Sequence, residues 1–264
     1  MPILTLTTDW GLRDHYLASF KGEILTRLPS LQMIDISHEV EKFNTMHAAY
    51  IIQNSFQKFP KGTIHFIGIS GNENCIAINP LVLIHSNGHY LLGEDNGIFT
   101  LILSENEKVI IRLPIERNAD RKTKCLVLLE TIKKLSEGTA LNKLGNEDTS
   151  IKESYFAQPT VDAQTIRGTI IFIDTFGNAI VNVTKSLFEN EKRGRNFIIQ
   201  LRKSTYDIKN IHKNYEDVEV GEIVALFNQD DFLEIALNKD SAGKLLGLKP
   251  MDPIRIEFNE SQAG

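Results

Sequence analysis

Cysteine is scarce in this 264-residue sequence, which contains only Cys75 and Cys125. The two lie far apart and form no Cys-x-x-Cys pair, so the sequence predicts neither a disulfide framework nor a cysteine-based zinc site. Such sparse cysteine usage favours a reduced, cytoplasmic protein. No apolar run approaches the length that a membrane span needs, and the chain begins with a strand pattern rather than a signal peptide, so we expect no membrane partner.

The sequence also lacks an excess of positive charge, because its formal net charge is -5. A nucleic-acid-binding domain usually carries a basic patch. The basic clusters at 117–124 and 192–195 are short and interrupted by polar or small residues, which is typical of solvated loops. We therefore expect no nucleic-acid partner.

Motifs for metals and common cofactors are missing as well. No group of His, Cys, Asp or Glu residues has the spacing of metal ligands. No glycine-rich phosphate loop follows a strand pattern. The sequence therefore predicts neither a metal site nor a cofactor.

The stretch that is most informative lies at the start of the chain. Residues 3–7 alternate between apolar and polar and predict a strand, which stops at Asp9, and an amphipathic helix opens after Asp14. Ligands of open α/β sheets bind beyond the carboxyl ends of the strands, where the Asp9 carboxylate could accept two hydrogen bonds from a sugar diol. Asp14 could cap the helix or meet a ligand ammonium. Spacing alone favours a simpler interpretation, a tight turn at Asp9 and Gly11 and an N-cap at Asp14.

The first half of the chain alternates between strand and helix patterns. Strands are predicted at 31–36 and 63–69, and a helix capped by Asn44 lies between them. This alternation indicates βαβ units and a mainly parallel sheet. Asn87-Gly88 predicts a hairpin, and a last helix is expected over 124–137.

From Ile151 onward the helical periodicity fades. Short strand patterns separated by Gly, Asn and Asp predict an antiparallel barrel or sandwich. We place a domain boundary near residue 160, which gives an N-terminal α/β domain over 1–160 and a C-terminal β domain over 161–264.

A series of short motifs then occurs in order along nearly the whole chain. It comprises Thr8-Asp9-Trp10-Gly11 with Asp14 and Tyr16, Lys21-Gly22, Ile34-Asp35-Ile36-Ser37-His38, Phe59-Pro60-Lys61-Gly62-Thr63, Asp95-Asn96-Gly97, Arg167-Gly168, Ile173-Asp174-Thr175-Phe176-Gly177-Asn178, Asn228 and Leu233-Glu234-Ile235-Ala236. The ordered set resembles the S-adenosylmethionine (SAM) hydroxide adenosyltransferases, which share a fold with the fluorinase and chlorinase. The resemblance implies an α/β domain, a C-terminal antiparallel β-barrel, and a homotrimer that holds SAM between domains of neighbouring subunits.

The resemblance also implies roles for individual residues. Asp9 would bind both ribose hydroxyls, Asp14 the methionine ammonium, and Phe43 would pack near the ribose and sulfonium. The other expected substrate-binding residues are Asp174 and Asn178 at the methionine end, Phe176 stacked on adenine, backbone groups near Ala236 at the adenine edge, and Tyr16, Asn96 and Asn228 within the matching motifs. These pairings suit the chemistry of a diol, an ammonium and a purine. A β-turn with a buried aromatic at 174–178, an ordinary turn at Asn96-Gly97 and a barrel-surface Glu234 remain alternatives.

One part of the family pattern is missing. Hydrolases of this family carry an Asp after the third strand, an Arg soon after it and a His before the last helix of the first domain. Here Ser70 stands at the Asp position, no Arg occurs between Ser70 and Ile111, and Thr123 stands near the expected His. Ser70 could place a halide nucleophile or could be a turn residue only. Glu73 is the carboxylate nearest to the lost Asp and the substitute base that we would test.

The missing residues leave two functions open. A water nucleophile benefits from a general base by roughly 10²–10⁴-fold. The chain could cleave SAM to adenosine and methionine by displacement at the ribose 5′ carbon, with weak or altered activity. Alternatively, it could be an inactive adenosyl-binding paralogue that acts as a sensor or structural trimer, and a scaffold without a ligand is a third option.

Overall fold

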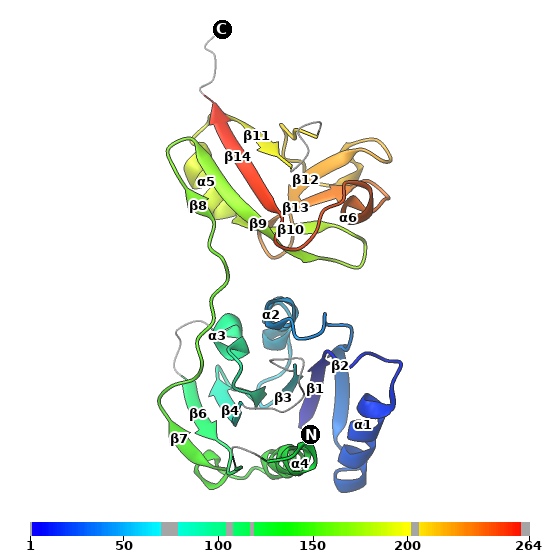
Figure 1. The fold of residues 1–264 in the computed structure, drawn as a ribbon, viewed down its shortest axis with the longest axis vertical. Coiled ribbons are helices and arrows are strands. Elements are labelled where there is room, and N and C mark those ends of the chain that lie inside the picture. Colours follow the sequence, from blue (N-terminus) through cyan, green and yellow to red (C-terminus); the bar gives the residue numbers. More distant parts are fainter. Residues whose placement is uncertain (1, 70–78, 104–107, 117–118, 202–205, 260–264) are drawn as a thin grey trace. The chain divides into compact units, whose positions relative to one another are not determined.

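The computed structural model describes residues 2–69, 79–103, 108–116, 119–201 and 206–259. The chain divides into two compact units, Met1–Phe156 and Ala157–Gly264. The first unit combines helices with a mixed sheet and the second is built mainly from antiparallel strands, which gives a two-part α/β and β protein (Figure 1). None of the helices in the described ranges is long and apolar enough to cross a membrane.

The first unit contains one seven-stranded sheet in the order β2-β1-β3-β5-β4-β6-β7. Its strands are β1 (Ile3–Thr8), β2 (Gln32–Ser37), β3 (Ile64–Gly68), β4 (Leu81–Ser86), β5 (His89–Glu94), β6 (Lys108–Arg112) and β7 (Asn146–Asp148). The four strands β2-β1-β3-β5 are parallel, whereas β5-β4, β4-β6 and β6-β7 are antiparallel pairs. The predicted mainly parallel sheet is therefore correct for one half only.

The change from parallel to antiparallel strand pairing in this sheet has a local cause. Asn87 and Gly88 both have positive φ angles, 52° and 83°, and form the two-residue turn between β4 and β5. Such a turn can join only antiparallel neighbours. The hairpin predicted at Asn87-Gly88 is confirmed, and its presence limits the parallel part to four strands.

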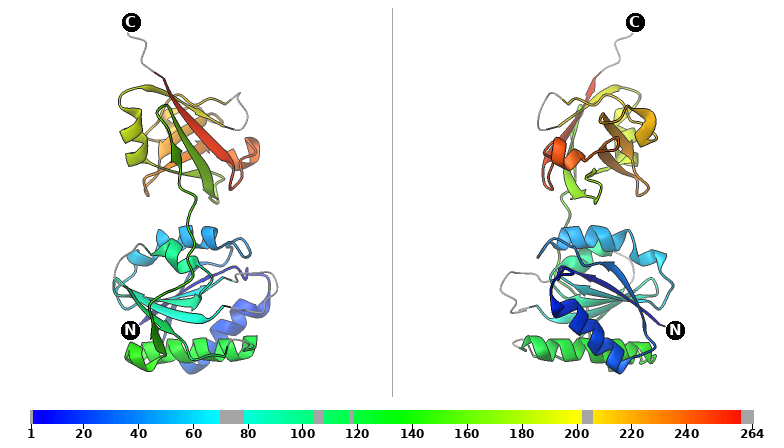
Figure 2. Two further views of the ribbon diagram at one scale, coloured as in Figure 1. Left: turned by 60° about the vertical axis from the view of Figure 1, so that its left-hand side comes forward. Right: turned by 90° about the vertical axis from the view of Figure 1, so that its right-hand side faces the viewer.

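Helices cover both faces of this sheet (Figure 2). One face carries α1 (His15–Arg27) and α4 (Arg121–Ser136), and the other carries α2 (Thr45–Gln53) and α3 (Ile98–Ile102), with short 3-10 helices at Phe56–Lys58 and Leu141–Lys143. Asn44 caps α2 by accepting a hydrogen bond from the His47 amide, as predicted, and Asp120 caps α4 in the same way from Thr123. The sequence did not predict α3, whose five residues are too few for a helical period to show.

A chain of buried polar side chains runs through the interior of this unit. Thr5 Oγ1 lies 2.7 Å from His65 Nδ1, and His65 Nε2 lies 3.1 Å from His89 Nδ1. The rings of Phe56 and Phe59 meet His65 edge-on. Burial, with a smaller contribution from His89, lowers the pKa of His65 to about 3, so this ring stays neutral in the folded protein at neutral pH.

This lowered pKa makes the first unit sensitive to acid. The unfolded chain takes up a proton at His65 near pH 6.5, whereas the folded chain does so only near 3. Stability is therefore complete above pH 6.5 and falls by up to about 1.4 kcal/mol per pH unit below it. In urea unfolding followed by the fluorescence of Trp10, the single tryptophan, His65→Gln should lose less stability than wild type between pH 7.5 and 5. Equal losses of stability in wild type and His65→Gln would show that His65 does not cause the sensitivity to acid.

The second unit is a curved antiparallel sheet in the order β11-β14-β9-β10-β13-β12, with β8 paired to β9. Its elements are β8 (Thr160–Val161), β9 (Thr165–Ile173), β10 (Ala179–Thr184), α5 (Lys185–Lys192), β11 (Asn196–Gln200), a 3-10 turn (Tyr215–Asp217), β12 (Ile223–Phe227), β13 (Phe232–Leu237), α6 (Ala242–Leu245) and β14 (Pro253–Asn259). Within the described residues β11 and β12 end the strand path of this antiparallel half-barrel, and the segment that follows β11 bridges to both of them, between Ile199 and Ile208 and between His212 and Leu226. The antiparallel β architecture expected for this unit is confirmed.

The curvature of this sheet depends on β9. Residues 165–169 of β9 pair with β14, and residues 170–173 pair with β10, so one strand serves both halves. At the bend, a Cβ added to Gly168 would lie 2.7 Å from Val183 Cγ2. The bend encloses an apolar core in which Phe188 of α5 is fully buried.

Candidate functional site

The carboxyl ends of the parallel strands meet at one edge of the first sheet, which is where open α/β sheets bind ligands. Asp9 follows β1, His38 follows β2, Ile69 follows β3, and Glu94 ends β5. Since the strand order is β2-β1-β3-β5, Asp9 stands near the centre of this edge. Three of these four residues are polar, so we take this edge as the candidate site of the first unit.

Asp9 is 7% exposed and helps to hold the edge together. Its Oδ2 accepts a hydrogen bond of 3.0 Å from the Phe43 amide. Phe43 lies in the loop before α2 and has a left-handed φ of 63°. The amide of Gly11 donates to the carbonyl of His38 at 2.8 Å. Two loops that the sequence assigned to the same site are thus joined, and Asp9 and Phe43 are brought together.

Asp14 and Tyr16 lie at the start of α1. Asp14 occupies the N-cap position, but its exposed side chain makes no capping hydrogen bond. The N-cap interpretation is therefore correct for its position and wrong for its side chain. Tyr16 is 42% exposed, and the Arg121 guanidinium lies 4.7 Å from the centre of its ring.

A series of polar side-chain contacts connects the elements next to Asp9. His38 Nδ1 lies 2.8 Å from Thr8 Oγ1, and its Nε2 lies 3.1 Å from Asp35 Oδ1. Lys21 Nζ donates to Asp35 Oδ2 at 2.6 Å. Partial burial works to raise the pKa of Asp35, but the contacts with Lys21 and His38 outweigh it and lower that pKa. This series of contacts links α1, β1 and the end of β2 directly behind Asp9.

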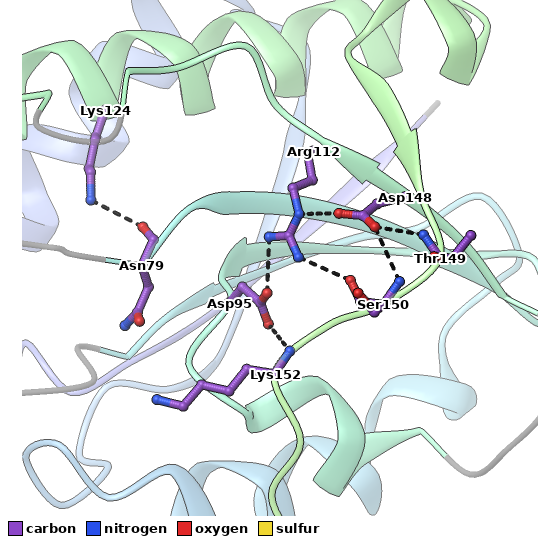
Figure 3. A network of polar contacts seen from close by, with 8 residues as sticks. All are labelled: Asn79, Asp95, Arg112, Lys124, Asp148, Thr149, Ser150 and Lys152. Atoms are coloured by element: carbon purple, nitrogen blue, oxygen red, sulfur yellow. Dashed lines mark hydrogen bonds and ion pairs between the residues drawn. The ribbon is translucent and has the colours of Figure 1, made fainter.

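Sequence reasoning missed one pair of charged residues at this edge. The side chain of Lys124, on α4, is 8% exposed, and its Nζ lies 3.7 Å from Glu94 Oε1. The same Nζ lies 3.4 Å from the Asn79 carbonyl (Figure 3). Burial raises the pKa of Glu94, the charge of Asp9 raises it further, and Lys124 and Asn79 act in the opposite direction. The feature of the sequence that could have identified Glu94 is a polar residue at the end of an otherwise apolar strand, as for Asp9.

Asn96 lies at the same edge, where its side-chain amide binds main chain. Its Nδ2 donates to the Ile69 carbonyl at 2.9 Å, and its Oδ1 accepts from the Ile98 amide at 3.1 Å. Asn96 is 7% exposed, and Gly97 after it has a φ of 99°. Asn96 thus joins the end of β3 to the start of α3, which is more than the ordinary turn that we kept as an alternative.

The neighbouring Asp95 belongs to a network around Arg112 (Figure 3). Asp95 is 5% exposed and accepts from Arg112 Nη1 at 3.0 Å and from the Lys152 amide at 2.8 Å. Arg112 also contacts the Asp148 carboxylate and donates to the Ser150 carbonyl. This network fixes residues 148–152 against the sheet.

The second unit presents its candidate residues on the turn between β9 and β10. The Asp174 carboxylate accepts two hydrogen bonds from Asn178, one from its backbone amide at 2.8 Å and one from its side-chain Nδ2 at 3.0 Å. The β-turn that we kept as an alternative is confirmed, because the Gly177 amide donates to the Asp174 carbonyl at 3.0 Å. Its aromatic is not buried, since Phe176 at the tip is 79% exposed. A pocket of about 220 Å³ adjoins the turn and is lined by Ile173, Asp174, Thr175, Phe176, Gly177, Ser241, Gly243, Lys244 and Leu248.

The remaining candidate residues of this unit lie on β13 and on the turn that precedes it, and Glu234 is close enough to Asp174 for their charges to interact. Asn228 closes the turn between these strands by accepting from the amides of Asp230 and Phe232 at 3.0 and 3.1 Å. Glu234 is 4% exposed and accepts a 2.6 Å hydrogen bond from the Tyr215 hydroxyl, so it is not a surface residue. Burial raises its pKa, and the charge of Asp174 adds to the effect. Ala236 is buried and pairs with Val224.

The two residues proposed for catalysis, Ser70 and Glu73, lie outside the described residues. Thr123, near the position of the missing His, is in the first turn of α4, and its amide is bound by Asp120. Across the ranges that the structure describes, no group of three or more His, Cys, Asp or Glu residues could hold a metal ion.

Comparison with known protein families matches both units of the chain. The model of the SAM hydroxide adenosyltransferase N-terminal domain matches residues 4–145, and that of the C-terminal domain matches residues 168–255. The chain belongs to the SAM hydroxide adenosyltransferase family. The resemblance derived from the ordered motifs is thereby confirmed.

Curated relatives within and beside this family cover nearly the whole chain. An (R)-S-adenosyl-L-methionine hydrolase of Methanocaldococcus jannaschii is 30% identical, over 98% of this chain and 97% of its own. A fluorinase of an Actinoplanes species is 24% identical, over 90% and 91%. Among solved structures, an uncharacterized conserved protein from Thermotoga maritima is 26% identical with a TM-score of 0.82, covering 97% of this chain and 99% of its own.

Proposed function

We propose that this member of the SAM hydroxide adenosyltransferase family binds SAM and cleaves it to adenosine and methionine by displacement at the ribose 5′ carbon, at a low rate. The observation that carries the proposal is the buried Asp9 carboxylate at the carboxyl edge of the parallel strands, in a chain similar over its length to SAM hydrolases. A buried carboxylate at a strand end suits a ribose diol, since charged acceptors form the stronger hydrogen bonds.

The second unit supplies the remaining chemistry of the proposal. The exposed ring of Phe176 offers an apolar face for adenine, and Asp174 with Asn178 offers a carboxylate and an amide for the methionine end. Asp14 of the first unit, whose side chain makes no capping hydrogen bond, would bind the ammonium. Neutral methionine is a good leaving group and needs no acid. The rate therefore depends on how the nucleophile is placed and deprotonated.

A binding-only function is the alternative, favoured by one observation. Thr123 stands near the position where the family's hydrolases carry a His, and it is a capped residue of a helix turn that cannot act as a base at neutral pH. If no other residues replace the Asp, Arg and His that the family's hydrolases carry, the protein retains an adenosyl site without turnover. It would then serve as a sensor or as a structural trimer.

Two measurements on the full chain separate these functions. Isothermal calorimetry with SAM and with adenosine should show binding of both, and chromatography of an overnight incubation with SAM should show adenosine and methionine in equal amounts. Binding without products would support the sensor. Absence of binding to either ligand would refute the proposal.

We further propose that the working form is a homotrimer, as the family resemblance implies. Light scattering coupled to size-exclusion chromatography should then give three times the mass of the chain. A monomeric mass for a protein that binds SAM would refute the trimer and leave the binding proposal intact.

A further inference from the structure

Lys124 is a buried cation whose surroundings call for an explanation. Lysine side chains are almost never fully buried unless they are paired, because desolvation of the ammonium is costly. Here the side chain is 8% exposed, and its ammonium lies 3.7 Å from the Glu94 carboxylate. The ammonium also donates to the Asn79 carbonyl (Figure 3). Lys124 lies in the first turn of α4, directly after Thr123.

Glu94 occupies a position from which it can reach a ligand. It is the last residue of β5, at the same sheet edge as Asp9, with only β3 between their two strands. Its side chain is 20% exposed, so it is not sealed in the core. The charged groups that face it are Lys124 from α4 and Asp9 after β1, together with the polar Asn79 before β4.

A purely structural ion pair explains these features less well. Exchanging a buried ion pair for apolar residues is often neutral or even stabilising, so a contribution to stability is a weak reason for placing one here. A second carboxylate beside Asp9 adds repulsion at this edge rather than stability. A role for the carboxylate in the reaction accounts for its place at the carboxyl edge of the parallel strands, near Asp9.

We propose that Glu94 accepts a proton from the attacking water and that Lys124 holds the Glu94 carboxylate in place, substituting for the Asp/Arg/His set that this chain lacks. The inference rests on the hydrolysis proposed above. The water oxygen forms a bond to the ribose 5′ carbon, and the carbon–sulfur bond breaks with its electron pair on the sulfur of methionine. The water proton passes to Glu94 and is later released to solvent, so the products are adenosine, methionine and one proton.

The environment of Glu94 suits this role. A general base works best when its pKa approaches the working pH. Burial and the neighbouring Asp9 raise the pKa of Glu94, as this requires, while Lys124 keeps the charged form accessible. Lys124 is proposed as a positioning residue, since its ammonium lies beside the Glu94 carboxylate and donates to the Asn79 carbonyl, so it would act through Glu94.

The test compares Glu94→Gln with wild type in the SAM hydrolysis assay across pH 4–9. Loss of the base should lower kcat by about 10²-fold or more, with the affinity for adenosine within threefold of wild type by calorimetry. Wild-type kcat should rise with pH as Glu94 loses its proton and then level off, and this rise should be absent in Glu94→Gln. Glu94→Asp, which keeps a carboxylate, should recover part of the rate.

Two further variants complete the design. Glu130→Gln removes a carboxylate from α4 whose side chain is 54% exposed and pairs with Lys134, and it should leave kcat unchanged. Lys124→Met should move the rising limb of the pH profile to higher pH, which a merely structural role would not do.

Each outcome bears on a definite claim. If wild type hydrolyses SAM and folded Glu94→Gln keeps kcat within threefold, the role of Glu94 is refuted and hydrolysis stands. If wild type binds SAM without any turnover, the hydrolysis proposal fails and the role of Glu94 fails with it. If Glu94→Gln does not fold, Glu94→Asp decides, since an unchanged rate and pH profile would overturn the proposal.

Discussion

Replacing Asp9 by Asn is expected to weaken the binding of SAM and of adenosine by about 10³-fold. Two hydrogen bonds from the ribose diol to a carboxylate contribute roughly 1.5–3 kcal/mol each, and 1.4 kcal/mol corresponds to a tenfold change in Kd. Asn retains one carbonyl oxygen, which can still accept the Phe43 amide, so the loop before α2 should stay in place. Calorimetry with both ligands measures the effect.

The control for this prediction removes a carboxylate that lies elsewhere in the same unit. Glu23, on α1, pairs with Arg27 one helical turn away, and its side chain is 54% exposed. Glu23→Gln should therefore bind both ligands as wild type does. If Asp9→Asn folds and its Kd is also unchanged, the assignment of Asp9 to the ribose is wrong.

Replacing Arg112 by Met is expected to lower the free energy of unfolding of the first unit by about 3 kcal/mol. The substitution leaves the Asp95 carboxylate, which is 5% exposed, without its cationic partner, and breaking a buried ion pair in this way is strongly destabilising. The contacts of Arg112 with Asp148 and Ser150 are lost as well. Urea unfolding followed by Trp10 fluorescence reports on this unit, because Trp10 packs against Phe20 and Phe66.

Two comparisons identify the cause of this loss. Arg27→Met, which removes a pair between neighbouring turns of α1, should cost no more than about 0.5 kcal/mol. Combining Arg112→Met with Asp95→Asn should recover part of the stability, since the uncompensated charge is then gone. A loss for Arg112→Met as small as that for Arg27→Met would show that the network contributes little.

Much of the first unit could be predicted from local patterns in the sequence. Alternation at residues 3–7 and the cap at Asn44 gave β1 and α2, and Asn87-Gly88 gave the hairpin of β4 and β5. What failed was the direction of the remaining strands. Strand direction depends on which edges pair across the sheet, and a single-sequence pattern contains this information only where a turn is as short as two residues.

The placement of polar residues directly after strands was predictable from the motifs, as for Asp9 after β1 and Asp174 after β9, whereas their roles toward a ligand stay predictions. The pairing of Lys124 with Glu94 was not predictable, because the two residues are thirty positions apart and meet only when α4 packs on the sheet. The ligand-binding role of Asn96 stays a prediction. In the structure the side chains of Asp95 and Asn96 have contacts within the protein that the motif alone does not reveal.

The tight approach at Gly177 has a consequence for how a ligand is received. A Cβ at this position would collide with Ser241 Oγ, and the Gly177 carbonyl accepts a 2.8 Å hydrogen bond from the Gly243 amide, so the turn is braced against the start of α6. Phe176 is thus displayed on a backbone that is already in its final shape. If adenine stacks there, as we propose, the nucleoside would meet a preorganised platform, and little conformational entropy would be lost in ordering it.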